Sequence, residues 1–351
     1  MNSQTFAERI RAASRDKPLT IRGGGSKDFY GGQPTGEVLD TRGHHGIVAY
    51  EPSELVITAR AGTPLAEIEA ALAANGQFLP FEPPAFGDAA TIGGVVAAGL
   101  SGPRRMTVGA LRDFVLGIKL IDGEARELKF GGQVMKNVAG YDVSRLITGS
   151  LGTLGLILDV SLKVLPRPVC ERTLRFGMPA DEALAKVNAW AAKPLSLSAS
   201  CWHDGMLSVR LSGALAAVKA AQQALGGELV PESDAQTFWH DLREQRLPFF
   251  AGEVPLWRLA VPPTTRAFEL AEPQLIEWHG GQRWLRTRTA ATELREAAVI
   301  AGGHATLFRG GDKALGTFTP LQAVMMALHR RLKAVFDPRG VFNPGRLYPD
   351  F

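Results

Sequence analysis

Residues 22–27 read Arg-Gly-Gly-Gly-Ser-Lys and directly follow a strand-like run, Leu-Thr-Ile at 19–21. Two more glycine-rich segments lie downstream, Thr91-Ile92-Gly93-Gly94 and Gly149-Ser150-Leu151-Gly152-Thr153-Leu154-Gly155. Glycine lets the backbone adopt positive φ and approach a ligand closely, with N–H groups directed at phosphate oxygens. One such cluster would fit an ordinary turn, but three between strand-like runs predict one extended, phosphate-bearing ligand. We interpret them as loops around a dinucleotide.

Each segment alone also fits a simpler structure. The first lacks both the Walker A spacing and the G-x-G-x-x-G fingerprint, so a hairpin turn remains an alternative. The second lies in a small-residue stretch, 89–102, which also suits close packing of strands or helices. In the third, the hydroxyls of Ser150 and Thr153 could donate to phosphate or ribose, while Leu154 and Ile157 could form an apolar wall.

Composition narrows the class of protein. A chain of 351 residues favours two domains. Its 39 basic and 35 acidic residues are dispersed, which gives little support to nucleic-acid binding. The two cysteines, Cys170 and Cys201, exclude a disulfide framework, favour a reducing compartment and cannot ligate an iron–sulfur cluster. The longest uncharged apolar run, 89–100, is too short to span a bilayer, so we expect a cytoplasmic protein.

Hydrophobic periodicity predicts two regions of different character. Strands are expected at 54–61, 114–121, 127–130 and 156–165, with an Asp122-Gly123 turn and a helix capped by Thr63 and ended by Gly76. The run Pro166-Arg167-Pro168 then marks a boundary. Beyond it we expect helices at 180–192, 214–226 and 320–335 and strands at 206–212 and 256–261, without glycine clusters.

Further motifs recur in a fixed order along the chain. These are Leu-Arg-Asp-Phe-Val-Leu-Gly at 111–117, Lys-Asn-Val-Ala-Gly-Tyr-Asp at 136–142, Asp337-Pro338 and Asn343-Pro344-Gly345. Together with the glycine segments they resemble the FAD-binding oxidase superfamily of vanillyl-alcohol oxidase and p-cresol methylhydroxylase (PCMH), within its glycolate and D-lactate oxidase branch. The run 302–312, Gly-Gly-His-Ala-Thr-Leu-Phe-Arg-Gly-Gly-Asp, and the short length are similar to the smaller, E-type FAD-binding subunits of bacterial glycolate oxidases.

The resemblance implies an α+β fold in three parts. Residues 1–167 would form a PCMH-type FAD-binding domain of two subdomains, and 168–335 an α/β cap domain with an antiparallel sheet. Residues 336–351 would return to the flavin site. The first and third glycine segments would hold the pyrophosphate, and the second would run along the flavin. The backbone near Ile157 would contact the adenine, and the Asn343 loop would approach the isoalloxazine.

The resemblance therefore implies FAD as the cofactor and a set of residues that bind it. They are Arg22, Gly23, Gly24, Gly25, Ser26, Lys27, Pro84, Thr91, Ile92, Gly93, Gly94, Gly102, Gly140, Tyr141, Asp142, Gly149, Ser150, Gly152, Thr153, Gly155, Ile157 and Asn343.

Two departures from the family pattern bear on the chemistry. Members with covalent flavin often carry a histidine in or beside the first glycine loop, where this chain has Gly24, Gly25 and Ser26, so we predict non-covalent FAD. Catalytic relatives also carry clustered histidines that accept protons or bind metal, whereas the seven histidines here are scattered. We therefore predict no metal site.

His304 and Arg309 are the remaining candidates to face a substrate. An arginine fork suits a carboxylate, and Asp312 could orient either group. A capped turn held by an arginine–aspartate pair would explain the same residues without chemistry. The aromatic segments 238–240 and 247–250 likewise suit either a partner surface or a buried core.

These observations favour an FAD-binding subunit of a multi-subunit 2-hydroxy-acid dehydrogenase that oxidises glycolate to glyoxylate. The resemblance implies a larger FAD-binding catalytic subunit and an iron–sulfur subunit as partners, with electrons delivered to the membrane quinone pool. The complex would lie in the cytoplasm or at the inner membrane's surface. A stand-alone FAD-dependent hydroxy-acid or alcohol oxidoreductase and a non-catalytic assembly subunit remain the alternatives.

Overall fold

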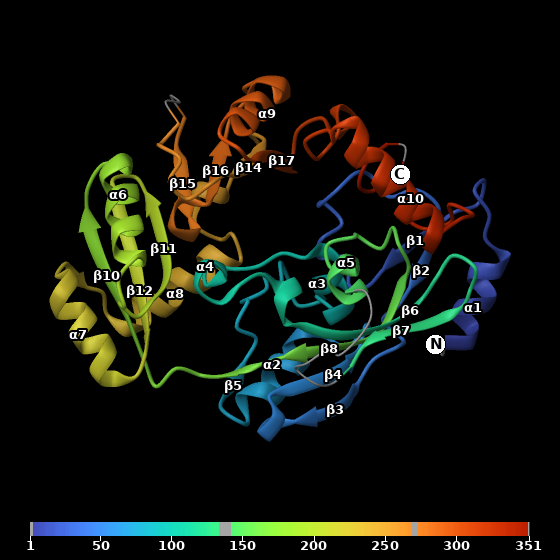
Figure 1. Ribbon diagram of the computed structural model, residues 1–351, viewed down its shortest axis with the longest axis horizontal. Coiled ribbons are helices and arrows are strands. Elements are labelled where there is room, and N and C mark those ends of the chain that lie inside the picture. The colour runs from blue at the N-terminus through green and yellow to red at the C-terminus, as the bar shows by residue number, and fades with distance from the viewer. Residues whose placement is uncertain (1–2, 133–141, 269–271, 350) are drawn as a thin grey trace. The chain divides into compact units, whose positions relative to one another are not determined.

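The computed structural model describes residues 3–132, 142–268, 272–349 and 351 (Figure 1). The chain divides into two compact units. The first comprises residues 1–100, 110–166 and 320–351, and the second comprises 101–109 and 167–319. The second unit is thus inserted into the sequence of the first.

The first unit is built on a five-stranded antiparallel sheet in the order β3-β4-β8-β6-β7. Its strands are β3 (Ile47–Glu51), β4 (Val56–Arg60), β6 (Val115–Ile121), β7 (Glu127–Gly131) and β8 (Leu156–Lys163). The three inner strands β4, β8 and β6 are mostly buried, whereas the edge strands β3 and β7 have no buried residue. The predicted Asp122-Gly123 turn joins β6 to β7, and Asp122 accepts the N–H groups of Glu124 and Arg126.

The first unit has further strands and helices outside this sheet. A parallel pair, β1 (Leu19–Arg22) and β2 (Glu37–Asp40), brackets the first glycine loop. The helices are α1 (Ser3–Ala12), α2 (Leu65–Ala73), α3 (Ile92–Ala98), α5 (Val143–Ile147) and α10 (Ala323–Phe336), and β5 (Gln77–Phe78) pairs with β9 (Leu165–Pro166). Helix α2 begins after Pro64, and Thr63 does not cap it as predicted, because the Thr63 hydroxyl donates to the carbonyl of Arg60 at 2.7 Å.

The second unit contains an eight-stranded antiparallel sheet in the order β13-β10-β12-β11-β15-β16-β14-β17. Its strands are β10 (Cys170–Gly177), β11 (Leu197–His203), β12 (Met206–Gly213), β13 (Glu228–Leu229), β14 (Leu256–Ala260), β15 (Gln274–Glu277), β16 (Gln282–Arg286) and β17 (His304–Arg309). The helices are α4 (Arg105–Val108), α6 (Ala180–Ala191), α7 (Leu215–Leu225), α8 (Glu232–Arg243) and α9 (Ala291–Ile300). Helices α6 and α7 cover one end of the sheet and α9 covers β14, β16 and β17.

Two segments lie in a different unit from the one that the predicted boundaries give them. Helix α10 belongs to the first unit, although the predicted boundary at 335 places it in the cap. Lys333 donates to the carbonyl of Thr153, and the carbonyl of Phe336 accepts the N–H of Gly123. Residues 101–109 join the second unit, because the indole of Trp278 donates to Gly102 and Thr107 donates to Ser198. The aromatic residues Trp239, Phe249 and Phe250 are buried, which favours the core interpretation of those segments over a partner surface.

A buried histidine lies in a strained turn of the second unit. Trp278, His279 and Gly280 all adopt positive φ, at 54°, 54° and 102°. His279 is 6% exposed, and its Nε2 atom has no hydrogen-bond partner among the described residues. Burial lowers the pKa of His279 from 6.5 to about 4, because the charged ring would lose its hydration.

The second unit is therefore expected to lose stability as the pH falls from 6.5 to 4. Between these pH values the unfolded chain binds a proton at His279 that the folded unit does not. The contribution of neutral His279 to the stability of the unit is therefore full above pH 6.5 and is lost toward pH 4. The loss from His279 corresponds to about 3 kcal/mol. Tryptophan fluorescence during urea unfolding measures it, because all six tryptophans lie within 167–319. His279→Asn, which tolerates positive φ, should remove much of the pH dependence; an unchanged pH profile in this variant would contradict the assignment.

Candidate cofactor-binding site

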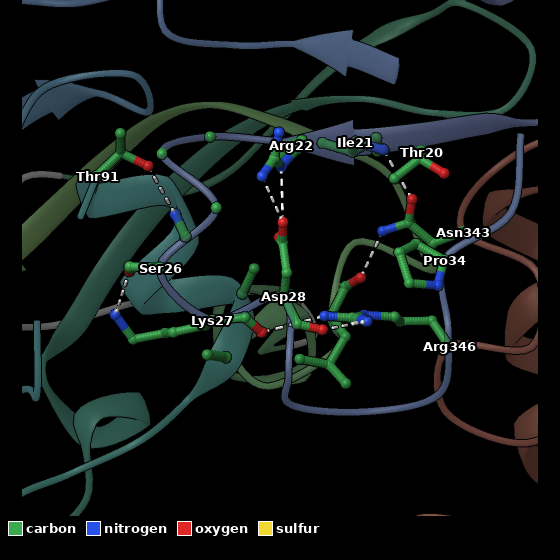
Figure 2. Close-up of a pocket in the computed structure, with 17 residues that line it drawn as sticks. Thr20, Ile21, Arg22, Ser26, Lys27, Asp28, Pro34, Thr91, Asn343 and Arg346 are labelled. Carbon is green, nitrogen blue, oxygen red and sulfur yellow. Dashed lines mark hydrogen bonds and ion pairs between the residues drawn. The ribbon is translucent and has the colours of Figure 1, made fainter. Parts of the chain in front are cut away.

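A cavity in the first unit lies where the end of β1, the first glycine loop, helix α3 and the C-terminal segment meet (Figure 2). Residues 20–28 supply most of its wall, and eight others complete it: Pro34, Thr91, Gly94, Ala97, Ala98, Leu151, Asn343 and Arg346. The first and third glycine segments, which are far apart in the sequence, thus line one cavity. This juxtaposition agrees with the predicted dinucleotide site.

The glycine loop has a conformation that only glycine accepts. A Cβ atom on Gly24 would lie 1.4 Å from the carbonyl oxygen of Ala89, and one on Gly23 would lie 2.3 Å from Oγ1 of Thr91. Gly25 has a φ of +74°. Within the described part of the chain, the N–H groups of Gly24, Gly25 and Ser26 form no hydrogen bond with protein. They are therefore available to an anion at the cavity, as successive backbone N–H groups are in phosphate-binding turns.

Two cationic side chains flank this loop and are held by neighbouring residues. Arg22 places Nε 2.7 Å and Nη2 2.6 Å from Oδ2 of Asp28. Lys27 donates from Nζ to the carbonyl of Ala85 at 3.1 Å and lies over the ring of Phe86. Both charges add positive potential at the cavity, while their hydrogen bonds fix the shape of the loop.

The C-terminal segment fixes the glycine loop from the other side. Asn343 accepts the N–H of Ile21 at 2.7 Å and donates to the carbonyl of Leu151 at 2.6 Å, so it joins β1 to the third glycine segment. Arg346 donates to the carbonyls of Lys27 and Asp28 (Figure 2) and also to that of Gly32. Burial lowers the pKa of Arg346, and the nearby charge of Asp28 opposes this shift. Sequence reasoning found Asn343 but missed Arg346, for which the only signal was its place three residues further along the same segment.

The second glycine segment serves both packing and the cavity. Gly93 packs against Ala61, since its Cβ would lie 2.5 Å from that of Ala61, and its N–H donates to the Ala61 carbonyl. Thr91 caps α3 by accepting the N–H of Gly94 at 3.3 Å, and Ile92 is buried. Gly94, Ala97 and Ala98 line the cavity from one face of α3, as their spacing of three and four residues requires. Small side chains thus leave space for a ligand beside the helix.

The third segment packs on the C-terminal end of α3. The N–H groups of Gly149 and Leu151 donate to the carbonyls of Val96 and Ala97 at 3.0 and 2.9 Å. The Thr153 hydroxyl is buried and donates to the carbonyl of Ser150, so it is not directed at the cavity. The hydroxyl of Ser150 is buried without a hydrogen-bond partner in the described chain. Leu151 supplies the apolar wall that was predicted for Leu154 and Ile157.

The other predicted residues that the structure describes do not line this cavity. Pro84 and Ile157 are buried, Gly152 and Gly155 adopt positive φ, and Asp142 accepts the N–H of Arg145 at the start of α5. Gly102 lies in the second unit, where its carbonyl accepts the indole N–H of Trp278 at 3.0 Å. Gly140 and Tyr141, with most of the motif at 136–142, lie outside the described residues.

His304 and Arg309 occupy the two ends of the six-residue strand β17. The pairing of β17 with β14 shifts register beside Arg309, where Arg309 pairs with Leu256 and Leu307 with Trp257. Arg309 donates to Oε1 of Gln245 at 2.8 Å, and Asp312 accepts the N–H of Ala314. Desolvation and the charges of Arg258 and Arg105 lower the pKa of His304. In the part of the chain that the structure describes, no three His, Cys, Asp or Glu residues could hold a metal ion.

Comparisons with known proteins agree with this geometry. Residues 2–131 match the family model of the FAD binding domain, and residues 312–347 match that of the FAD linked oxidases' C-terminal domain. The glycolate oxidase subunit GlcE of Escherichia coli K12 is 50% identical over 99% of this chain and 98% of its own length. The subunit GlcD of Bacillus subtilis is 32% identical over 45% of this chain and 34% of its own. An alkyldihydroxyacetonephosphate synthase structure shares the fold, with a TM-score of 0.67 at 14% identity over 97% of this chain and 74% of its own.

The fold and the glycine-lined cavity thus define a flavoprotein of the FAD-linked oxidase class, and the predicted α+β fold is confirmed. The chain belongs to the family of the glycolate oxidase subunit GlcE. Its cofactor is FAD, and the free N–H groups of the glycine loop fit a pyrophosphate. Among the described residues no helix is long and apolar enough to cross a membrane.

Proposed function

We propose that this chain is the smaller FAD-binding subunit of a complex that oxidises glycolate, a 2-hydroxy acid, to glyoxylate. The observation that carries the proposal is the 50% identity to subunit GlcE across both chains, joined with the cavity at residues 20–28. When bound, FAD supplies the hydride acceptor for oxidation of a carbon that bears a hydroxyl group.

In this proposal the chain's own residues hold the cofactor. The N–H groups of Gly24, Gly25 and Ser26 bind the pyrophosphate, and Arg22 and Lys27 balance part of its charge. Asn343 and Arg346 fix the loop by their hydrogen bonds to the backbone of Ile21 and of residues 27–32. The face of Gly94 and Ala97 leaves space beside α3.

Electrons would leave the flavin through other polypeptides. Cys170 and Cys201 lie on separate strands, and two cysteines cannot ligate a cluster. The partners would be a larger FAD-binding subunit and an iron–sulfur subunit, with the complex peripheral to the inner membrane. The scattered histidines, in place of the clusters that catalytic relatives carry, favour a role in electron relay or assembly, with substrate chemistry on the larger subunit.

The flavin is expected to be bound non-covalently. None of the residues described as lining the cavity is a histidine, cysteine or tyrosine, so the cavity lacks a side chain that commonly tethers flavin. The purified chain should show flavin absorbance, and acid precipitation should release all of it to the supernatant. Flavin that stays with the precipitated polypeptide would contradict non-covalent binding, and a colourless chain that takes up no FAD would favour the assembly-subunit alternative.

Activity is expected only in the assembled complex. Co-expression with both partner subunits should give glycolate-dependent reduction of an artificial electron acceptor, and the isolated chain should give none. Turnover of glycolate or D-lactate by the isolated chain would contradict this expectation and favour a stand-alone oxidoreductase.

A further inference from the structure

Helix α10 leaves most of its apolar side chains in solvent. It spans 14 residues, of which only Phe336 is buried, while Val324, Leu328 and Val335 are 80%, 45% and 66% exposed. At 100° per residue these three positions fall within about 40° of one another and form a stripe along the helix. We call Val324, Leu328 and Val335 the α10 stripe. Exposed Arg331 lies on the same face between Leu328 and Val335, so the stripe joins apolar side chains with positive charge. Exposed apolar side chains gathered on one face mark an interaction surface more often than isolated ones do.

The opposite side of α10 anchors the helix to the first unit. Lys333 lies about 180° around the helix from Val324. Its Nζ donates to the carbonyls of Thr153 and Phe342 and to Asp337 at 2.6, 2.9 and 2.8 Å. The Phe336 carbonyl accepts the N–H of Gly123 at 2.8 Å. The helix is therefore held in place with its apolar stripe directed away from these contacts.

A cationic cavity adjoins the same helix. It has a volume of about 430 Å³, and Arg15, Arg330, Lys333 and Arg339 line it; among the residues that the structure describes, Asp337 is the only acidic side chain in its wall. Asp337 already accepts Lys333 and the N–H groups of Val341 and Phe342. Helix α10 itself contains no acidic residue. The surface thus pairs an apolar stripe with excess positive charge.

We propose that the α10 stripe and this cavity together form a docking surface for the larger FAD-binding subunit, through an apolar segment flanked by carboxylates. A carboxylate of that segment enters the cavity while its apolar side chains cover the stripe. A second copy of this chain is a poor occupant, since it would bring like charges together. The identity of the partner rests on the proposed function. The acidic character of its docking segment is inferred from the positive charge of the cavity.

Co-purification of the co-expressed complex tests the apolar half of this surface. Leu328→Glu on the tagged full-length chain should lower the amount of larger subunit retained by about tenfold or more. Its flavin content and unfolding temperature should stay as in the wild type. Leu215→Glu is the matched control, because Leu215 also lies on a helix and is 47% exposed, against 45% for Leu328. This control should retain the partner.

A second variant tests the charged half. Arg15→Glu reverses an exposed charge at the cavity and should weaken retention several-fold, with a smaller loss of binding on adding salt than in the wild type. Arg266→Glu, which reverses an exposed charge of the second unit, should retain the partner as the wild type does.

Three outcomes would overturn the inference. Retention of the partner by both Leu328→Glu and Arg15→Glu would place the interface elsewhere. A fall in the unfolding temperature of the isolated Leu328→Glu chain would show that this chain covers its own stripe. A wild-type dimer that Leu328→Glu dissociates would assign the stripe to a second copy. If the wild-type chain binds FAD but retains no larger subunit, the proposed complex fails together with the docking surface, whereas missing FAD with intact retention contradicts only the flavin role.

Discussion

Gly24→Val is expected to abolish FAD retention by the purified chain. A Cβ atom at this position would lie 1.4 Å from the carbonyl oxygen of Ala89, so the loop must move before any valine side chain fits. That movement displaces the N–H groups of Gly24, Gly25 and Ser26, which have no other partner among the described residues. The ratio of flavin to protein absorbance, after gel filtration with excess FAD, measures the loss.

The control for Gly24→Val is Gly177→Ala, since no atom lies within 4 Å of a Cβ at Gly177 and its φ is not positive. Full flavin content is expected in this control. The unfolding temperature of apo Gly24→Val should stay within a few degrees of the apo wild type, because the loop lies at the surface. Undiminished flavin in Gly24→Val would show that the cofactor does not depend on this loop.

Asp337→Ala is expected to destabilise the first unit by about 3–5 kcal/mol, because it leaves the ammonium of Lys333 buried without its counter-charge. The Asp337 carboxylate is 2% exposed and accepts Lys333 Nζ at 2.8 Å and the N–H groups of Val341 and Phe342 at 3.0 and 2.9 Å. Urea unfolding followed by tyrosine absorbance measures the effect, because all four tyrosines lie in segments of the first unit.

The tryptophan signal provides an internal control for Asp337→Ala, because all six tryptophans lie in the second unit. The tryptophan transition should move much less than the tyrosine transition. Asp337→Asn, which keeps an acceptor oxygen for one backbone N–H, should cost less than alanine. Equal shifts of both transitions would show that the two units unfold together, and no shift in either would contradict the role given to the ion pair.

The glycine loop and most elements could be predicted because their signals are local. The glycines at 23–25 predict by themselves a backbone that a ligand can approach closely. Strands β6, β7 and β8 follow from strand-like apolar runs and from the Asp122-Gly123 turn. The antiparallel α+β class and the FAD cofactor are confirmed.

Other features could not be predicted because they depend on contacts that are distant in the sequence. Arg346 reaches carbonyls more than 300 residues away, and its only local signal is its place three residues after Asn343. The Thr63 hydroxyl was expected to cap α2, but it donates a hydrogen bond to the carbonyl of Arg60 instead. His304 and Arg309 lie at the two ends of β17, and the contact of Arg309 with Gln245, 64 residues away in the sequence, has no local signal. The roles of the individual cofactor-binding residues stay predictions.

The hydrogen bonds of Asn343 and Arg346 to the glycine loop join segments that the ribosome makes at very different times. The second unit is complete by residue 319, while the first unit still lacks its residues from 320 onward. The glycine loop, made among the first thirty residues, then waits for partners some 320 positions later. The five-stranded sheet is complete by Lys163, whereas helix α10 and residues 343–346, which hold the glycine loop, are made after the second unit. We expect the loop to reach its FAD-binding form only once these residues have been made.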